Sequence, residues 1–220
     1  MKPLVLTGAL NGWVVVDNGV IAAVSPAQPA SLPDGADILD CTGCTIVPGF
    51  WNAHVHFFER KWDKAAGIPD DELAAQLRDF TRYGFTGVFD LSSEIANTSA
   101  LRARIDGGVA GPRIFTTGPG LVPPGGPPPE SVSRVMGIVP TSMPMASTAN
   151  SALRAVDALV EAGADAIKIF ASGNAPDTVM RPEVFRAAAQ RAQHYGKAVF
   201  VHPNTAADVR MALQNDAGVI

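Results

Sequence analysis

The chain has 220 residues, of which 47% are hydrophobic and 17% are charged, and its formal net charge is −4 at pH 7. This composition excludes intrinsic disorder, and the absence of a basic region argues against a nucleic-acid partner. No apolar run reaches the roughly 20 residues that cross a bilayer, and two cysteines are too few for a disulfide framework, so we expect a cytoplasmic protein with no membrane partner.

The first 48 residues are typical of a β-rich segment. Short apolar runs are separated by Asn11-Gly12 and Asn18-Gly19, which are dipeptides that favour tight hairpin turns. Expected strands cover residues 4–6, 13–16, 20–24, 36–39 and 45–47. Cys41 and Cys44 form a C-x-x-C that we interpret as part of a turn, because no second cysteine pair follows. The sequence therefore predicts a small β domain over residues 1–48.

After Pro48, short apolar strands alternate with amphipathic helices. The expected strands are residues 49–57, 86–91, 113–117, 164–171 and 198–202, and the expected helices are 70–83, 97–105, 148–162, 181–195 and 205–217. This alternation predicts a parallel α/β sheet or barrel. Five strand–helix units and the opening of a sixth strand are fewer than the eight units of a complete barrel, which usually needs about 250 residues. Residues 49–220 are therefore expected to form a partial (β/α)8 TIM-type barrel.

The first strand of this second region carries two histidines. Strict alternation places His54 and His56 on the same face as Asn52, near the carboxyl end of the strand, with Trp51 and Val55 on the other face. Two imidazoles at positions i and i+2 can hold one metal ion. The alternative is a pair of histidines that only forms hydrogen bonds.

Two further strands carry candidate site residues. Lys168 lies between Ile167 and Ile169, so it faces inward, where an ammonium must be paired, neutralised or chemically converted. Its amine could instead reach a carboxylate at the end of the strand. His202 ends the fifth strand, whereas His194 lies in the last turn of a helix and is interpreted as structural.

These residues carry a family resemblance. The segment from Val47 to His56 resembles the opening strand of the metal-dependent amidohydrolase superfamily, in the imidazolonepropionase-like and prolidase-like subgroup. The leader that ends at residues 40–49 is similar to the junction between that family's small β domain and its barrel. Lys168 resembles the strand-four lysine that becomes a carbamate bridging two metals, and His202 resembles the strand-five metal ligand.

The resemblance implies metal-dependent hydrolysis of a carbon–nitrogen bond in an amide, cyclic amide or peptide-like small-molecule substrate. His54 and His56 would bind one Zn²⁺, Lys168 as a carbamate would bridge two, and His202 would bind the second. The family commonly has Asp where this chain has Asn52. It also takes a histidine from strand six and an aspartate from strand eight, so we expect the 220-residue chain alone to lack full activity.

Two alternatives remain open at this point. One is a mononuclear zinc hydrolase or deaminase in which Lys168 is unmodified, and the other is a non-catalytic fragment or interaction module that retains the fold. An incomplete barrel leaves sheet edges free, which favours self-association or a second chain that completes the barrel. Asp90 is interpreted as a structural acid or one that orients a ligand, residues 118–146 as a loop that lines the site or moves, and residues 172–174 as a turn.

Overall fold

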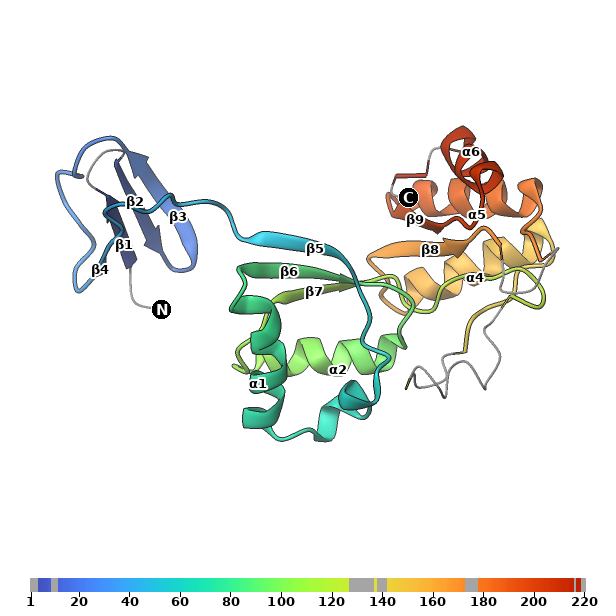
Figure 1. The fold of residues 1–220 in the computed structure, drawn as a ribbon, viewed down its shortest axis with the longest axis horizontal. Coiled ribbons are helices and arrows are strands. Elements are labelled where there is room, and N and C mark those ends of the chain that lie inside the picture. The colour runs from blue at the N-terminus through green and yellow to red at the C-terminus, as the bar shows by residue number, and fades with distance from the viewer. Residues whose placement is uncertain are drawn as a thin grey trace. The chain divides into compact units, whose positions relative to one another are not determined.

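The computed structural model describes residues 4–8, 12–126, 137, 142–172, 178–215 and 217–218. The chain divides into two compact units, Met1–Pro48 and Gly49–Ile220 (Figure 1). The expected start of a sixth strand covers residues 218–220, and its residues 219–220, like much of the long loop within residues 118–146, lie outside the described residues.

The first unit is a four-stranded sheet in the order β3-β2-β1-β4. Its strands are β1 (Leu4–Gly8), β2 (Gly12–Asp17), β3 (Val20–Ser25) and β4 (Asp37–Asp40). Asn18 and Gly19 both have positive φ, at 48° and 80°, which is the backbone that a two-residue hairpin turn between β2 and β3 requires.

The strand expected at residues 45–47 is wrong. The backbone turns after β4, where the Cys44 N–H donates to the Cys41 carbonyl at 2.9 Å, and the residues that follow pair with no strand among those described. Ile46 and Val47 are exposed. Pro48 lacks an N–H and restricts the residue before it, so this apolar run enters the second unit without joining a sheet.

The described residues of the second unit include five parallel strands in two groups. Strands β5 (Phe50–Val55), β6 (Phe85–Asp90) and β7 (Arg113–Thr116) form one sheet in that order, and β8 (Ala166–Phe170) pairs with β9 (Ala198–His202). The groups are joined by hydrogen bonds, because the Asp165 N–H donates to the Thr116 carbonyl and the Leu121 N–H donates to the Lys168 carbonyl, each at 2.8 Å.

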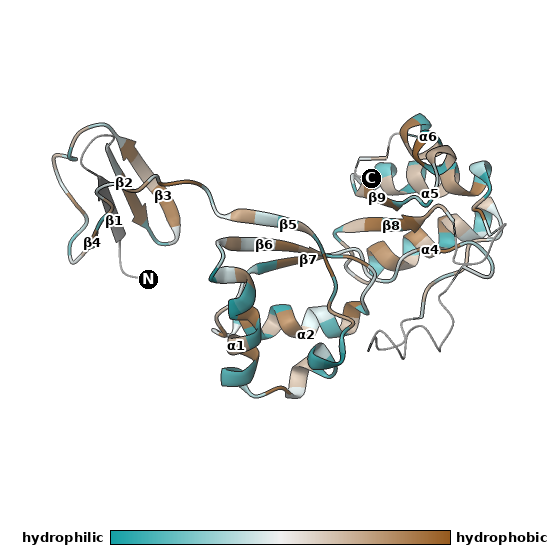
Figure 2. Ribbon diagram, viewed as in Figure 1, coloured by the Kyte–Doolittle hydropathy of each residue, from teal (hydrophilic) through white to brown (hydrophobic). Residues whose placement is uncertain are grey.

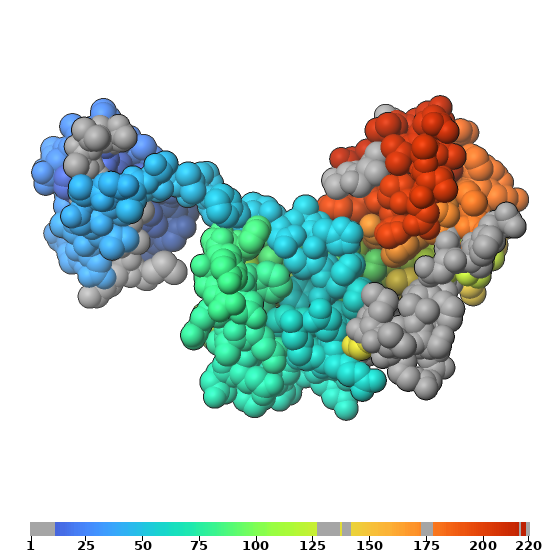
Figure 3. Space-filling model, viewed as in Figure 1, coloured from blue at the N-terminus to red at the C-terminus, as the bar shows by residue number. Residues whose placement is uncertain are grey.

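In the described part of the chain, five α-helices alternate with these strands, each within a few residues of its expected position. They are α1 (Asp70–Thr81), α2 (Ile95–Asp106), α4 (Ala149–Glu161), α5 (Pro182–His194) and α6 (Ala206–Gln214), with short 3-10 turns η1 (Arg60–Trp62) and η2 (Ala65–Gly67) after β5. The segment after β5 packs closely with α1 in the space-filling view (Figure 3). None of the described helices combines the length and apolar character needed to cross a membrane.

The two faces of the strands in the second unit contribute to different clusters of buried apolar residues. Ile167 and Ile169 of β8 pack with helices α4 and α5, and Val55 of β5 packs with α1. Phe89 and Phe200 belong to a different cluster, with their ring centroids 4.7 Å apart. The strands β8 and β9 are largely hydrophobic along their length (Figure 2), as expected for parallel strands covered on both faces. We call the face that carries Phe89 and Phe200 the inner face.

Strict alternation along β5 is a second expectation that the structure corrects. The pairing of β5 with β6 shifts between Phe50 and Trp51, and again between Asn52 and Val55. The Trp51 ring packs 5.1 Å from Phe115, which lies 5.7 Å from Phe89 on the inner face, whereas Val55 faces the helices. Extra residues in one strand change which side chains face which side, so Trp51 and Val55 do not share a face.

Candidate active site

The carboxyl end of β5 holds two imidazoles in direct contact. Nε2 of His54 lies 3.2 Å from Nε2 of His56, and their rings are nearly perpendicular, with centroids 4.9 Å apart. Asn52, two residues earlier, does not reach this contact: its side-chain oxygen accepts the backbone N–H of His54 at 3.1 Å. Asn52 therefore shapes the backbone that presents His54.

The His56 ring is oriented by the neighbouring strand. Its Nδ1 lies 2.5 Å from the carbonyl oxygen of Leu91, the residue directly after β6. Since a carbonyl oxygen only accepts, Nδ1 carries the proton, and the Nε2 of the neutral ring keeps a lone pair that faces His54. Phe58 stacks on the other side of the His56 ring at 4.3 Å.

Lys168 is a buried lysine in the middle of β8. Its residue is 3% exposed, and burial lowers the pKa of its amine to about 8. Among the residues that the structure describes, no carboxylate forms an ion pair with it, so the alternative in which its amine reaches a carboxylate has no support there. Its Nζ instead lies 5.4 Å from the centroid of the Phe170 ring.

His202 is the last residue of β9 and lies beside the same aromatic ring. Its ring centroid is 5.1 Å from that of Phe170, and its Nε2 is 3.1 Å from Oδ1 of Asn204. Burial, followed by the positive charge of Lys168, lowers the pKa of His202. Burial lowers the pKa of His54 too, with further contributions from His56, Lys168 and His202.

The structure therefore brings His54, His56, Lys168 and His202 into one electrostatic neighbourhood. Burial is also the largest cause that lowers the pKa of His56, and Lys168 contributes again. These lowered pKa values keep the imidazoles neutral, which is the form that can bind a cation. Across the described part of the chain, however, no three His, Cys, Asp or Glu side chains are grouped closely enough to hold one ion.

Asp90 has a structural position. It is fully buried, and its carboxylate accepts hydrogen bonds from Phe57 N, Ser93 Oγ, Thr98 Oγ1 and Thr116 Oγ1. Burial raises the pKa of this carboxyl, and the hydrogen bonds oppose the rise. Asp90 joins the ends of β5, β6 and β7 to helix α2, which matches the structural interpretation of this acid.

The remaining candidates lie elsewhere. His194 ends α5 and contacts Tyr195, and Cys41 and Cys44 are free cysteines in the turn after β4. Ser172 donates to Asp208 at 2.8 Å, whereas residues 173–174 lie outside the described residues.

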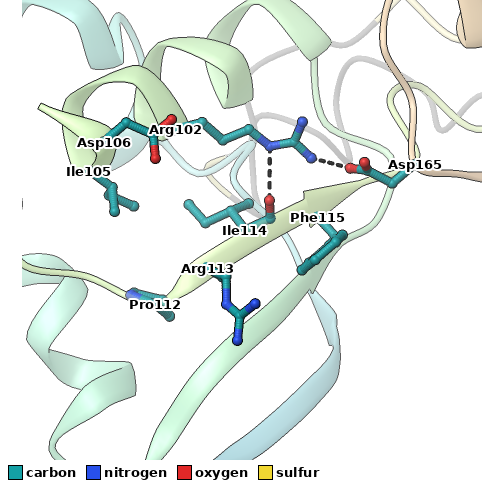
Figure 4. Close-up of a pocket in the computed structure, with 8 residues that line it drawn as sticks. All are labelled: Arg102, Ile105, Asp106, Pro112, Arg113, Ile114, Phe115 and Asp165. Atoms are coloured by element: carbon teal, nitrogen blue, oxygen red, sulfur yellow. Dashed lines mark hydrogen bonds and ion pairs between the residues drawn. The ribbon is translucent and has the colours of Figure 1, made fainter. Parts of the chain in front are cut away.

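A pocket of about 260 Å³ lies at the opposite end of the strands (Figure 4). It is found where β7 and β8 begin, and Arg102 crosses it to reach the Ile114 carbonyl at 2.8 Å and the Asp165 carboxylate. Asp165 also accepts the Thr116 N–H at 2.9 Å. In α/β barrels the amino ends of the strands serve stability and the carboxyl ends serve chemistry, so this pocket is separate from the histidine cluster.

The sequence reasoning missed the groups that hold His56 in place. The Leu91 carbonyl accepts from the ring, and the Thr117 hydroxyl accepts the N–H of Ser92 at 3.1 Å. The available signal was the run of hydroxyl residues directly after β6 and β7, at Ser92, Ser93 and Thr117, because polar residues at strand ends are positioned to orient a site.

The comparisons with known proteins point in one direction. No family model matches the chain. Dihydroorotase of Mycobacterium tuberculosis is 36% identical over 80 residues, which is 36% of this chain and 17% of that protein. The structure of an amidohydrolase matches 98% of this chain and 60% of its own at 26% identity, with a TM-score of 0.72. A prolidase in complex with N-methylphosphonate-L-proline matches the same shares at 26% identity, with a TM-score of 0.73.

These likenesses support the amidohydrolase superfamily and an α/β fold of the kind found in its members. The chain spans 60% of the length of both solved structures and a smaller share of the dihydroorotase. The named neighbours are hydrolases, so the similarity supports an enzyme family.

Proposed function

We propose that this chain carries part of the active site of a metal-dependent hydrolase that cleaves carbon–nitrogen bonds. The observation that supports the proposal is the contact between His54 and His56 together with the mutual electrostatic influence of His54, Lys168 and His202. The similarity to an amidohydrolase, a prolidase and a dihydroorotase supports the reaction class, and an amide, cyclic amide or peptide-like molecule is the proposed substrate.

The donor atoms fit a divalent metal such as Zn²⁺. His54 and His56 are two neutral imidazoles whose Nε2 atoms lie 3.2 Å apart, and they face each other without a carboxylate between them. Imidazole nitrogen is a good ligand for zinc. When bound, the metal would polarise the carbonyl of the substrate and supply a hydroxide nucleophile near neutral pH.

Lys168 is suited to the bridging role once its amine is converted. A pKa of about 8 leaves a substantial neutral fraction near physiological pH, and the neutral amine is the form that reacts with carbon dioxide. The new N–C bond forms a carbamate as the nitrogen loses one proton, so a buried cation becomes an anionic oxygen donor. His202 is the proposed ligand of the second ion.

The proposed architecture is a small β domain, residues 1–48, followed by an incomplete barrel, residues 49–220. The chain spans 60% of the amidohydrolase and prolidase structures, so the activity of the whole protein and its substrate are part of the proposal. A small-molecule substrate and a second copy of this chain or another chain are the proposed partners. The cytoplasm is the proposed location.

A mononuclear zinc site is the second candidate, and one observation favours it. His54 and His56 are in contact, while in the described residues no third His, Cys, Asp or Glu joins them closely enough to complete a site. In that case Lys168 stays unmodified and the two histidines of β5 are the main ligands.

Metal stoichiometry distinguishes these candidates. The purified chain is titrated with Zn²⁺ by calorimetry, with and without bicarbonate, and the bound metal is measured by mass spectrometry. We expect about two ions per chain with bicarbonate dependence if the carbamate forms, and about one ion without it if the site is mononuclear. Absence of binding would support the non-catalytic module instead.

Variants connect the metal to the named residues. His54→Ala and His56→Ala should weaken zinc binding in either case, whereas Lys168→Met should remove only the bicarbonate-dependent ion. His194→Ala is the matched control, because His194 lies at the end of α5. Hydrolysis of dipeptides ending in proline and of cyclic amides, with added zinc or manganese, then tests the substrate class.

A further inference from the structure

We propose that Thr117 is a positioning residue for His56, acting through the peptide unit between Leu91 and Ser92. The inference rests on the proposed function, because the orientation of His56 matters only if its Nε2 binds a metal. Thr117 follows β7 directly and is fully buried. Its side-chain hydroxyl forms hydrogen bonds with Ser92 and Gly118, and not with the imidazole of His56.

The peptide unit Leu91–Ser92 carries both groups that matter. Its carbonyl oxygen accepts from Nδ1 of His56 at 2.5 Å, and its N–H donates to Oγ1 of Thr117 at 3.1 Å. In a planar trans peptide the C=O and N–H point in opposite directions. Holding the N–H on Thr117 therefore aims the carbonyl at His56.

The hydroxyl of Thr117 has a defined direction of its own. It donates to the Gly118 carbonyl at 2.9 Å, which leaves its lone pairs for the Ser92 N–H. The Thr117 N–H also donates to the Asp90 carbonyl at 3.0 Å, so the residue is tied to the end of β6 at its backbone as well. Thr117 is thus a fixed acceptor and not a mobile side chain.

The backbone at Ser92 shows why an anchor is needed. Ser92 has φ of 70°, a left-handed conformation that is costly for a residue other than glycine. Its own hydroxyl is buried and has no hydrogen-bond partner among the described residues, so it does not stabilise the turn. The Thr117 contact offsets part of this cost and keeps the carbonyl in place.

The other end of Leu91 is also held. Its N–H donates to the Val55 carbonyl at 2.9 Å, so the two backbone groups of Leu91 contact the last residue of β5 and the residue that follows it, His56. Rotation of the Leu91–Ser92 peptide would turn the Leu91 carbonyl away from His56. Thr117 is the group that opposes this rotation, and it acts from a third strand.

The test compares Thr117→Val with Thr117→Ser. Valine keeps the shape and removes the acceptor, whereas serine restores the hydroxyl. NMR of the imidazole nitrogens reports the tautomer of His56 in the metal-free chain, and calorimetry reports the Zn²⁺ dissociation constant. We expect Thr117→Val to populate both tautomers of His56 and to weaken zinc binding about 10–100-fold, with Thr117→Ser close to wild type.

Thr148→Val is the matched control. It removes a threonine hydroxyl that accepts one backbone N–H, that of Ser151, at the start of α4. It should lower stability without changing the tautomer of His56. If it alters the tautomer as Thr117→Val does, or if Thr117→Val leaves the tautomer unchanged, the positioning role is overturned.

A failure to fold and a failure of the proposed function can each be distinguished from a failure of the positioning role. If Thr117→Val does not fold, Thr117→Cys keeps a weak acceptor in a similar volume, and an intermediate tautomer ratio is expected. If the wild-type chain binds no zinc, the proposed function is overturned, and the tautomer comparison alone decides the role of Thr117.

Discussion

At the scale of single residues, the buried groups Asp90 and Lys168 are accommodated by different means. Asp90 is surrounded by donors from four residues, whereas Lys168 has no carboxylate partner in the described part of the structure. A buried acid with enough donors stabilises the fold around it. A buried amine with none destabilises the fold unless it loses its proton or is converted.

Lys168 should therefore make stability depend on pH. Its pKa falls from 10.5 in the unfolded chain to about 8 in the fold, so between these values the unfolded chain binds more protons and stability rises with pH. We expect Lys168→Met to remove this rise and to stabilise the chain at pH 7 by up to about 3 kcal/mol in buffer free of carbon dioxide. Urea unfolding from pH 7 to pH 10 measures it.

The comparison needs an exposed lysine as its reference. Lys64→Met removes a lysine in an exposed position and should leave the pH dependence of wild type intact. If the free energy of unfolding changes equally with pH in wild type and in Lys168→Met, Lys168 is not desolvated in the fold.

Asp90 should be costly to remove. In Asp90→Ala, three hydroxyls and the Phe57 N–H lose a charged acceptor inside the protein. We expect the free energy of unfolding to fall by about 3–5 kcal/mol, the range for breaking a buried charged network. Urea denaturation measures this loss, with the exposed Asp71→Ala as control, and a loss no larger than that of the control would refute the structural role.

At the scale of elements, the ends of the strands and helices decide how the site is presented. Helix α6 begins four residues after His202, and its start is a capping box: Thr205 Oγ1 accepts the Asp208 N–H, and Asp208 accepts the Thr205 N–H. Asp208 also accepts from Ser172, which follows β8. This cap therefore connects the ends of the two strands that carry Lys168 and His202.

Removing the cap should loosen that connection. We expect Thr205→Ala to lower the free energy of unfolding by about 1 kcal/mol, because the Asp208 N–H loses its acceptor at the helix start. Thr205→Ser retains the hydroxyl and should stay near wild type. Thermal denaturation followed by circular dichroism checks both variants, and equal losses for serine and alanine would contradict the capping role.

At the scale of the whole molecule, the second unit leaves two strands with a free edge among those described. Strand β5 pairs only with β6, and β9 pairs only with β8. Phe50 and Trp51 on β5 are about half exposed, although both are large aromatic residues. Unpaired edges and exposed apolar surface favour association with another chain.

The isolated chain should accordingly self-associate. We expect its weight-average mass in sedimentation experiments to rise with protein concentration, and Trp51→Lys to shift the distribution toward monomer because it places a charge on the exposed ring position. Val20→Lys replaces another exposed apolar residue, in the first unit, and should leave association unchanged. A chain that stays monomeric over the whole concentration range would contradict this prediction.

The places of the candidate residues along the strands were predictable from sequence, because they depend on local order. His54, His56 and His202 follow from their positions near strand ends, and the inward direction of Lys168 follows from alternation with Ile167 and Ile169. All five helices were found because their apolar spacing and their glycine or proline boundaries are local signals. The metal and the carbamate remain proposals.

What sequence alone determined is therefore the order of strands and helices and the chemical groups that they carry, because periodicity and caps act over a few residues. Only the tertiary structure decided the shifts in β5 that turn Trp51 inward, the loss of a strand at residues 45–47, and the Leu91–Ser92 peptide that links Thr117 to His56. These features depend on hydrogen bonds between residues far apart in the chain, and such partners are chosen by the packing of the whole fold.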